Sequence, residues 1–242
     1  MPHRPLPAAV VAVAGVLLSA CGGGAPASPG SHDRATAPGS TAATPSKVPA
    51  AKRPPSGKPT TTTTTDPGLL PQTTVLPSTT SPQFHAEMNA LWDGIVTGSV
   101  PTAMRSFFPR SAYLQVKAIS NPSADYANRL VAHFALDVAA AHALLGPQAA
   151  GAKLLRVTTV PGYATWIVPG YCYNRIGYWH LPGSRMVYEE GGQVRSIGIM
   201  SLISWRGVWY VVHLGGVSRT SDTGLVDSPS IGPGTPGPPG GC

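Results

Sequence analysis

The chain has 242 residues, among them 28 Gly and 27 Pro, and only 11% of its residues are charged. These proportions predict a folded core diluted by segments that bury too little apolar surface to offset the entropy of ordering. The formal net charge is +7, but the positive residues are scattered, with no Lys/Arg run longer than Lys52–Arg53; because a nucleic-acid binder gathers basic residues on one face to neutralise phosphates, we expect no nucleic-acid partner.

Residues 1–20 are expected to be a signal peptide. Arg4 supplies the positive start, and the apolar run from Ala8 to Leu18 is far shorter than the roughly 20 residues of a membrane-spanning helix. The run leads into Leu18-Ser19-Ala20-Cys21, which resembles the bacterial lipobox. That resemblance implies cleavage before Cys21 and a diacylglycerol thioether on its sulfur, which would anchor the protein at the outer face of the cell membrane. The alternative is an ordinary secreted protein with an unrelated cysteine near its cleavage site.

Residues 21–82 are expected to form a linker behind the lipidated Cys21. The segment is rich in Pro and Thr, including the run from Thr60 to Thr65, and shows no apolar periodicity. Because Pro removes backbone donors throughout, the segment favours an extended tether that holds a domain away from the membrane. Its composition resembles the O-glycosylated spacers of actinobacterial lipoproteins.

A single domain is expected over residues 83–216, and its first half is predicted to be helical. Ser81-Pro82 is a typical helix start, and Gly98 follows the stretch as a stop. The apolar residues of this first helix fall on one face: Phe84, Met88, Leu91 and Ile95. A short second helix is predicted to hold Met104, Phe107 and Phe108 and to end at Pro109.

The clearest helix of the chain is predicted between Asn121-Pro122 and Gly146-Pro147. Asp125 in its first turn interacts favourably with the helix dipole. The apolar stripe steps by threes and fours, which indicates one face packed on a core. Its members are Ala127, Leu130, Val131, Phe134, Val138, Ala141 and Leu145.

The second half of the domain is predicted to be strands separated by short turns. Segments rich in Val, Ile, Tyr and Trp, such as Leu154–Val160 and Val208–Leu214, lie between the turns. Adjacent strands joined by short turns run antiparallel, and Gly198 within the long stretch 194–205 is expected to mark a bulge or kink. We therefore expect an α+β domain whose helices pack on one face of an antiparallel sheet. The turn signals are Pro161-Gly162, Pro169-Gly170, Pro182-Gly183, Gly191-Gly192 and Arg206-Gly207.

The last segment, residues 217–242, is expected to be a disordered Gly/Pro-rich tail. It ends in Cys242, which together with Cys172 remains once Cys21 is lipidated. An exported location permits a disulfide, and a flexible tail could bring Cys242 to the domain. The open alternative is a buried Cys172 and a free terminal thiol.

Two stretches of the domain resemble the NTF2-like (SnoaL-like) superfamily. Residues 91–99, followed by 103–109, are similar to its opening helices, and residues 204–214 are similar to its last hairpin, where a Trp-containing strand closes the sheet. The resemblance implies a cone in which helices lie against a curved antiparallel sheet around a pocket. Members of this superfamily include both enzymes and binding modules, so the fold alone does not assign an activity.

No catalytic residue is assigned from the sequence, but six side chains are candidates for lining a pocket. On the third helix, Asp137 and His133 share a stripe with Arg129 at steps of four; they either form an acid/base pair or a solvated hydrogen-bonded row. In the strands, alternation places Trp209 and His213 on one face, where they either line a pocket or pack in the core. The six candidates are His133, Asp137, Tyr178, His180, Trp209 and His213. No spacing indicates three or four convergent metal ligands, and no Gly-rich phosphate loop follows a strand, so neither a metal nor a cofactor is expected.

These observations predict a membrane-anchored, extracytoplasmic lipoprotein whose domain is a non-catalytic module of the cell envelope. Its expected partners are the membrane, through the lipid on Cys21, and a small apolar ligand or an envelope protein. One alternative is an envelope enzyme of the isomerase or dehydratase type that uses His133, Asp137 or His213. Another is a purely structural lipoprotein.

Overall fold

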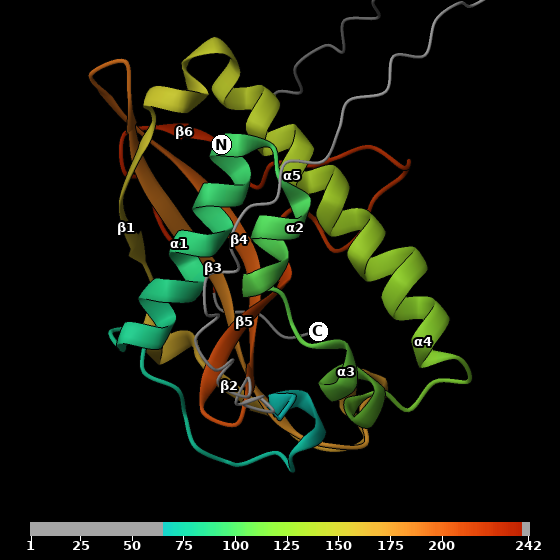
Figure 1. The fold of residues 1–242 in the computed structure, drawn as a ribbon. Coiled ribbons are helices and arrows are strands. Elements are labelled where there is room, and N and C mark those ends of the chain that lie inside the picture. The colour runs from blue at the N-terminus through green and yellow to red at the C-terminus, as the bar shows by residue number, and fades with distance from the viewer. Residues whose placement is uncertain (1–64, 239–242) are drawn as a thin grey trace, which may run out of the picture. The chain divides into compact units, whose positions relative to one another are not determined.

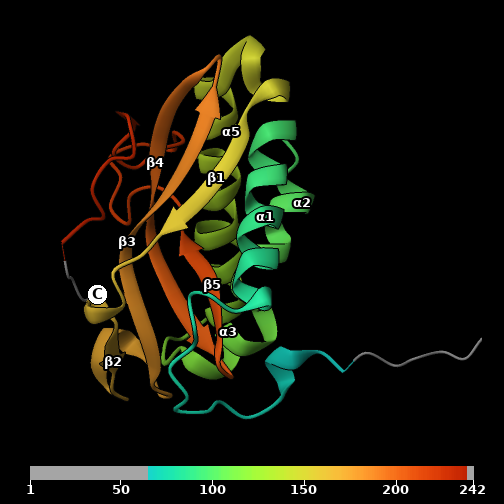
Figure 2. The ribbon, with the colours of Figure 1, turned by 90° about the vertical axis from the view of Figure 1, so that its left-hand side faces the viewer.

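The computed structural model describes residues 65–238. In this part of the chain a group of helices covers one face of an antiparallel sheet (Figures 1 and 2), which is the expected α+β class. The expectations for the signal peptide, for the lipid on Cys21, for the linker up to residue 64 and for Cys242 fall on residues outside this range.

The first helix, α1 (Pro82–Thr97), lies where the sequence predicts it. The Ser81 side chain accepts a hydrogen bond from the backbone N–H of Phe84, which satisfies one of the free donors of the first turn. The helix ends at Gly98, whose φ of +64° is a left-handed conformation that glycine adopts at little cost.

The prediction for the second helix is wrong about where the helix ends. The chain forms α2 (Val100–Ala103) and a short 3₁₀ turn, η2 (Met104–Ser106), but Phe107 is extended, and it bridges Val211 in parallel. Phe107 and Phe108 are drawn out of the helix because their rings pack deep in the core instead. Helix α3 (Arg110–Val116) follows directly.

The long predicted helix is confirmed and continuous, but it is not uniform. It comprises α4 (Pro122–Asp125), the π-helical segment η3 (Tyr126–Val131), α5 (Ala132–Leu145) and the 3₁₀ segment η4 (Gly146–Gly151). By length and composition alone, the stretch Pro122–Gly151 could cross a membrane, a test that the core helices of folded domains also pass. Here Phe134, Val138 and Ala141 pack into the core of the domain.

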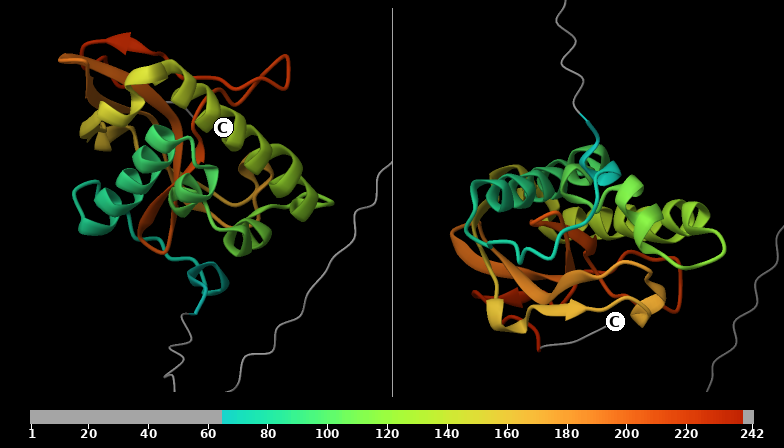
Figure 3. Two further views of the ribbon diagram at one scale, coloured as in Figure 1. Left: turned by 45° about the horizontal axis from the view of Figure 1, so that its top comes forward. Right: turned by 90° about the horizontal axis from the view of Figure 1, so that it is seen from below.

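The sheet has the strand order β1-β3-β4-β5, with β2 added beside β3 and β6 beside β4, and all its pairs are antiparallel. Two tight hairpins, at Gly191-Gly192 and Arg206-Gly207, join the three central strands as predicted. Figure 3 shows the helices gathered over one face of this twisted sheet. The strands are β1 (Lys153–Thr158), β2 (Thr165–Ile167), β3 (Tyr178–Glu190), β4 (Gln193–Trp205), β5 (Val208–His213) and β6 (Ser230–Ile231).

Two details of the predicted strands are wrong. The turn expected at Pro182-Gly183 does not form, because β3 continues through these two residues. Gly183 has a φ of +59°, and its carbonyl accepts a hydrogen bond from the Gly237 N–H. The expected bulge at Gly198 is also absent, because Gly198 pairs regularly with Arg185; the register of β4 against β5 shifts instead between Ser201 and Leu202. Gly198 serves a different purpose, since a Cβ there would lie 1.9 Å from Asp227 Oδ2.

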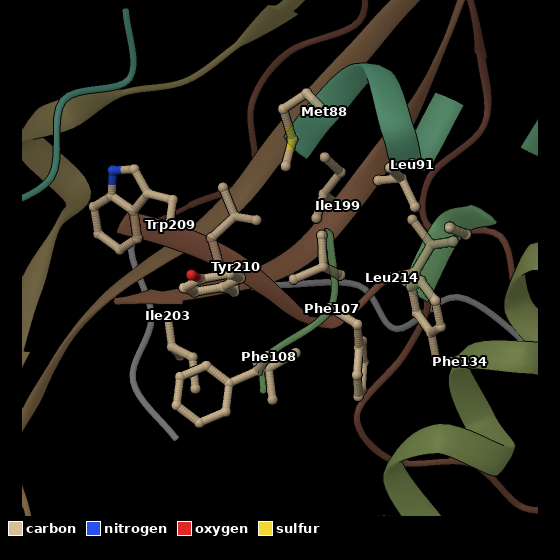
Figure 4. Packing of buried hydrophobic residues seen from close by; sticks show 14 of the residues in the cluster. Met88, Leu91, Phe107, Phe108, Phe134, Ile199, Ile203, Trp209, Tyr210 and Leu214 are labelled. Atoms are coloured by element: carbon tan, nitrogen blue, oxygen red, sulfur yellow. The ribbon is translucent and has the colours of Figure 1, made fainter. Parts of the chain in front are cut away.

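The core fills the space between α1, α5 and the three central strands. Figure 4 shows Met88 and Leu91 of α1 meeting Ile199 of β4, with the aromatic rings of Phe107 and Phe134 beside them. The Phe107 and Phe134 rings lie 4.5 Å apart between centroids. Burial of this apolar surface is the main source of the domain's stability.

The folded domain extends beyond the expected limits of 83 and 216 at both ends. Before α1, the carbonyls of Pro67 and Pro77 accept hydrogen bonds from the indole N–H groups of Trp205 and Trp209, each at 3.0 Å. After β5, the chain up to residue 238 packs on the domain and adds β6 to the edge of β4. Composition identified both segments as unstructured because neither carries an apolar repeat, yet proline carbonyls are good acceptors for buried donors.

Candidate functional site

A cavity of about 620 Å³ lies at the end of the domain formed by α3, η3 and the strands β3, β4 and β5. The segment after β5 supplies part of its wall. Most of the lining surface is apolar, and polar and charged side chains lie among the apolar ones. The lining residues of the helices and the loop after them are Tyr113, Val116, Lys117, Arg129 and Leu130; those from residue 167 to 213 are Ile167, Cys172, Tyr173, Tyr178, His180, Pro182, Gly183, Arg185, Met200, Ser201, Ile203, Val212 and His213; and those of the last segment are Val217, Asp227, Ser228, Thr235, Gly237 and Pro238.

The strands bring two histidines to the same region of the cavity. Ser201 of β4 is the register partner of His213 of β5, at the point where the pairing shifts. On the other side of Ser201, its Oγ is hydrogen-bonded to Nε2 of His180 on β3 at 2.7 Å, and both side chains are buried. Cross-strand neighbours on one face of a sheet approach in this way, so register alone groups His180, Ser201 and His213.

Tyr178 is the first residue of β3 and also lines the cavity. Its hydroxyl accepts a hydrogen bond of 2.9 Å from Asn174 Nδ2, and both residues are buried. Burial raises the pKa of Tyr178, so the phenol stays neutral and acts in the cavity wall as a polar but uncharged group.

The π-helical segment η3 contributes Arg129 and Leu130 to the cavity. The Arg129 guanidinium is held by Asp125, which lies outside the cavity lining. Arg129 Nε and Nη2 donate to the two carboxylate oxygens of Asp125 at 2.7 and 2.6 Å. The Tyr113 hydroxyl donates to the same carboxylate. The hydrogen bonds from Arg129 hold the pKa of Asp125 below its ordinary value. π-Helical turns often occur at functional sites, and here the turn carries a fixed cation into the lining.

The loop before β3 is fastened to the chain that leaves α3. Arg175 N–H donates to the Val116 carbonyl at 2.8 Å, and Ala118 N–H donates to the Tyr173 carbonyl at 2.7 Å. Within the loop, Cys172 and Tyr173 adopt left-handed backbone conformations, with φ of 54° and 56°. Non-glycine residues reach this region at an energetic cost, and such strain is concentrated at binding and catalytic sites.

Lys117 lies between Val116 and Ala118, in the chain that leaves α3, and lines the cavity. Its Nζ donates to the Cys172 carbonyl at 2.8 Å. Burial, followed by the positive charge of Arg129, lowers the pKa of Lys117, and Asp125 acts in the opposite direction. The ammonium group is therefore a partly desolvated cation, and only a neutral carbonyl is hydrogen-bonded to it among residues 65–238.

His213 experiences the same positive environment. Burial lowers its pKa to about 4, with further contributions from Arg129, Arg219, His133 and Lys117. His213 is therefore neutral at pH 7, and its imidazole offers one donor and one acceptor to the cavity.

The far wall of the cavity is built around a buried arginine. Arg185 is 3% exposed, and its Nη1 and Nη2 donate to the Ser228 carbonyl at 2.7 Å and to Ser196 Oγ at 2.6 Å. Burial lowers the pKa of Arg185, and Asp227 partly opposes this effect. The C-terminal segment crosses directly over the guanidinium at Gly234, where a Cβ would lie 2.5 Å from Nη2.

Three of the six residues predicted to line a pocket do so, namely Tyr178, His180 and His213. Trp209 lies in the core, 1% exposed, with its indole bonded to Pro77. His133 is half-buried on α5 and is not part of the lining.

Asp137 is buried, and its carboxylate binds the C-terminal segment rather than His133. Its carboxylate accepts hydrogen bonds from both Nη atoms of Arg219, at 3.0 and 2.9 Å, and from the N–H groups of Gly215 and Leu225, at 3.0 and 2.8 Å. The spacing of four along the helix correctly placed Asp137 near His133. No pattern in residues 217–242 indicated that this segment returns to the helix and occupies the Asp137 oxygens.

Among the polar or charged lining residues that were not predicted are Lys117, Arg129 as a pocket residue, Arg185 and Ser201. Lys117 follows a helix end in a stretch without periodicity, so no pattern indicates its direction. Arg185 lies in a strand whose alternation would have placed it on one face, but the segment that covers it is remote in sequence. Only a prediction of the pairing register between β3 and β4 could have shown that Ser201 lies close to His180.

Among residues 65–238, no group of three or more His, Cys, Asp and Glu side chains could hold a metal ion. Cys172 is disulfide-bonded, and its partner lies outside that range because residues 65–238 contain no second cysteine. Pairing of Cys172 with Cys242 stays a prediction. It agrees with the position of Gly237 and Pro238, which line the same cavity as Cys172.

Comparison with known proteins gives no match: neither a protein-family model, nor a curated protein, nor a solved structure is significantly similar to the chain.

Proposed function

We propose that this protein is a lipid-anchored module of the cell envelope whose domain binds a small, largely apolar ligand without converting it. The observation that carries the proposal is the cavity of about 620 Å³ with a mainly apolar lining. Binding sites for small molecules fall in this size range and combine apolar walls with a few placed polar groups. The lipobox-like ending at Cys21 and the Pro/Thr-rich segment behind it support the location.

Two features favour binding over catalysis. Asp137, the carboxylate that could have acted with His133, has its oxygens occupied by four donors of the C-terminal segment. His213 lines the cavity, but with a pKa of about 4 it is a weak base at neutral pH. We also infer that the domain is NTF2-like, a proposal supported by the helices over one face of a twisted antiparallel sheet and by a cavity between the two.

The binding proposal is tested by native mass spectrometry of the full chain purified from its membrane in mild detergent. The wild-type protein is expected to carry a ligand of defined mass. A Met200→Trp variant is expected to lose that ligand, because Met200 is half-buried in the lining and a larger ring would fill the space. The matched control is Met104→Trp, which changes another half-buried methionine outside the lining and should keep the ligand. A wild-type protein that is empty, and that binds no apolar probe, contradicts the proposal.

The anchor is tested separately. A Cys21→Ala variant should appear in the medium, since it lacks the thiol that carries the acyl chains. Retention of this variant in the membrane fraction contradicts the lipidation.

A catalytic function is a second candidate, favoured by the hydrogen bond of 2.7 Å between Ser201 Oγ and His180 Nε2 in the cavity wall. A hydroxyl beside an imidazole is the start of a nucleophile–base arrangement. Covalent labelling of the wild-type protein by a serine-reactive phosphonate, lost in Ser201→Ala and kept in Ser204→Ala, would support it. Ser204 is a suitable control because it lies on the same strand, buried but outside the cavity.

A further inference from the structure

The charged residues in the cavity wall are unbalanced. Among residues 65–238 the lining contains three cationic side chains, Lys117, Arg129 and Arg185, and one carboxylate, Asp227. Asp227 lies beside Arg185, and Arg129 is paired with Asp125 from outside the lining. Neither Arg185 nor Lys117 has an acidic partner within 4.0 Å in the described part of the chain. The two differ in their hydrogen bonds, because both Nη atoms of Arg185 already donate, to the Ser228 carbonyl and to Ser196 Oγ, whereas Lys117 donates to one carbonyl alone among residues 65–238.

Lys117 is also held in a position that keeps donors available. An ammonium group has three N–H donors, and one of them is directed at the Cys172 carbonyl at 2.8 Å. The backbone on both sides is fixed, because the loop that carries Cys172 is hydrogen-bonded to Val116 and Ala118. A partly desolvated cation at the wall of an apolar cavity gains most from an anion that enters the cavity with it.

The neighbouring groups add to this positive environment. The charged and titratable groups that act most strongly on His213 are Arg129, Arg219, His133 and Lys117, all of which are positive when charged. They lie on the η3–α5 helix, on the segment after α3 and on the C-terminal segment. An anion bound beside Lys117 would offset their field at His213, so His213 is a natural reporter of such a ligand.

From this arrangement we infer that the cavity takes an anionic, single-chain amphiphile such as a fatty acid, with its head group at Lys117 and its chain against Leu130, Ile203 and Val212. The inference rests on the proposed binding function and adds the chemical class of the ligand. The head group is recognised by its negative charge, and the chain by burial among apolar side chains. Binding should weaken about fourfold for each methylene removed from the chain.

The test compares three probes of equal chain length below their aggregation concentrations: dodecanoate, dodecanol and dodecylammonium. Each is titrated into the full chain after bound ligand has been removed, and binding is followed by calorimetry. Dodecanoate is expected to bind about tenfold or more tightly than dodecanol, because a hydrogen bond to a charged group adds to the burial of the chain. Dodecylammonium is expected to bind least.

A Lys117→Met variant should bring the affinity for dodecanoate to that for dodecanol and leave dodecanol binding unchanged. The matched control, Lys153→Met, removes the same charge from an exposed position on β1 and should keep the preference for dodecanoate. By NMR, dodecanoate should raise the pKa of His213 in the wild-type protein, whereas dodecanol should not.

The outcomes separate the two proposals. If all three probes bind equally, or if the preference persists in Lys117→Met, the cavity is a binding site but the anionic ligand class is wrong. If none of the three binds, the proposed function fails together with this inference.

Discussion

The two ends of the space between the helices and the sheet are built in opposite ways. At one end, side chains such as Met88, Leu91 and Ile199 fill the volume, and the rings of Phe107 and Phe134 lie in contact. At the other end, Lys117 and Arg129 border an open volume of about 620 Å³. The strands β3, β4 and β5 contribute to both ends, but α1 and α5 cover the filled end and α3 and η3 border the open one. The difference therefore lies in the helical side chains and in the groups that hold them.

The comparison shows how a domain can leave a hole in its own interior. Apolar side chains close up because contact and burial stabilise them. Two of the charged groups around the cavity are held by partners outside its lining, namely Arg129 by the Asp125 carboxylate and Arg185 by Ser196 Oγ. The C-terminal segment completes the wall, and it is fastened from the helix side by Asp137.

The largest effect is expected from breaking that fastening. Asp137→Ala should lower the free energy of unfolding by about 3–5 kcal/mol, because Arg219 would remain as a buried cation without its carboxylate and two backbone N–H groups would lose their acceptor. The measurement is urea unfolding, combined with hydrogen exchange of residues 215–231. Exchange in this segment should rise more than exchange in α1.

Asp93→Ala is the control for this prediction, since it removes an exposed aspartate from α1 and should change the free energy of unfolding by less than about 0.5 kcal/mol. Equal effects of the two substitutions would mean that the C-terminal segment is not held through Asp137.

The second prediction compares the two ends directly with one residue type. Met88→Ala should lower the free energy of unfolding by about 2–5 kcal/mol, because Met88 is 1% exposed in the filled end and its removal creates a void. Met200→Ala removes the same atoms from the cavity wall, where space is already present, and should cost roughly 1 kcal/mol or less. The check is urea unfolding of both variants side by side. A cost for Met200→Ala as large as that for Met88→Ala would mean that the cavity is filled in solution.

The third prediction concerns pH. His213 has a folded-state pKa of about 4 against an ordinary value of 6.5, so the unfolded chain takes up a proton at this residue before the folded one does. The contribution of His213 to the free energy of unfolding is therefore fully present above pH 6.5. It falls by up to about 3 kcal/mol as the pH is lowered towards 4. A His213→Gln variant should lose this part of the slope when unfolding is measured between pH 7 and 4. An unchanged slope would mean that His213 is already solvated in the folded protein.

The sequence was sufficient for the parts of the fold that depend on local patterns. Helix α1 follows from the Ser81 cap, the apolar stripe and Gly98, and the hairpins between β3, β4 and β5 follow from their Gly-containing turns. Such signals lie within a few residues of one another, so they can be identified without knowing the fold.

The candidate site was predicted only in part because its residues meet through long-range contacts. Tyr178, His180 and His213 were identified as aromatic or polar positions in strands, and all three line the cavity. Lys117 and Arg185 were missed, since their directions depend on the loop at Cys172 and on the segment around Ser228. The C-terminal segment was the largest error, because its low-complexity composition concealed a set of backbone and arginine contacts.

The smallest effect on stability is expected at the ion pair between Asp125 and Arg129. A substitution there changes the charge near the cavity but hardly changes the free energy of unfolding. The pKa of Asp125 lies below its ordinary value mainly through the hydrogen bonds from Arg129, so the pair stabilises the fold above about pH 4 and is lost as the pH falls through the lower folded-state value. Arg129 is 40% exposed, so Asp125→Asn should cost only about 0.5–1 kcal/mol at pH 7 in urea unfolding, and this cost should shrink as the pH is lowered below about 4.

The same substitution should have a clearer effect on the cavity than on stability. Without the Asp125 carboxylate, the charge of Arg129 acts on its surroundings with less compensation, so the pKa of His213 should fall further when it is measured by NMR. Asp222→Asn, which removes an exposed aspartate from the C-terminal segment, should leave the pKa of His213 nearly unchanged. A fall in the first variant and not in the second would place the source of the positive environment at the π-helical segment, whereas equal values would assign it to the C-terminal segment and to Arg219.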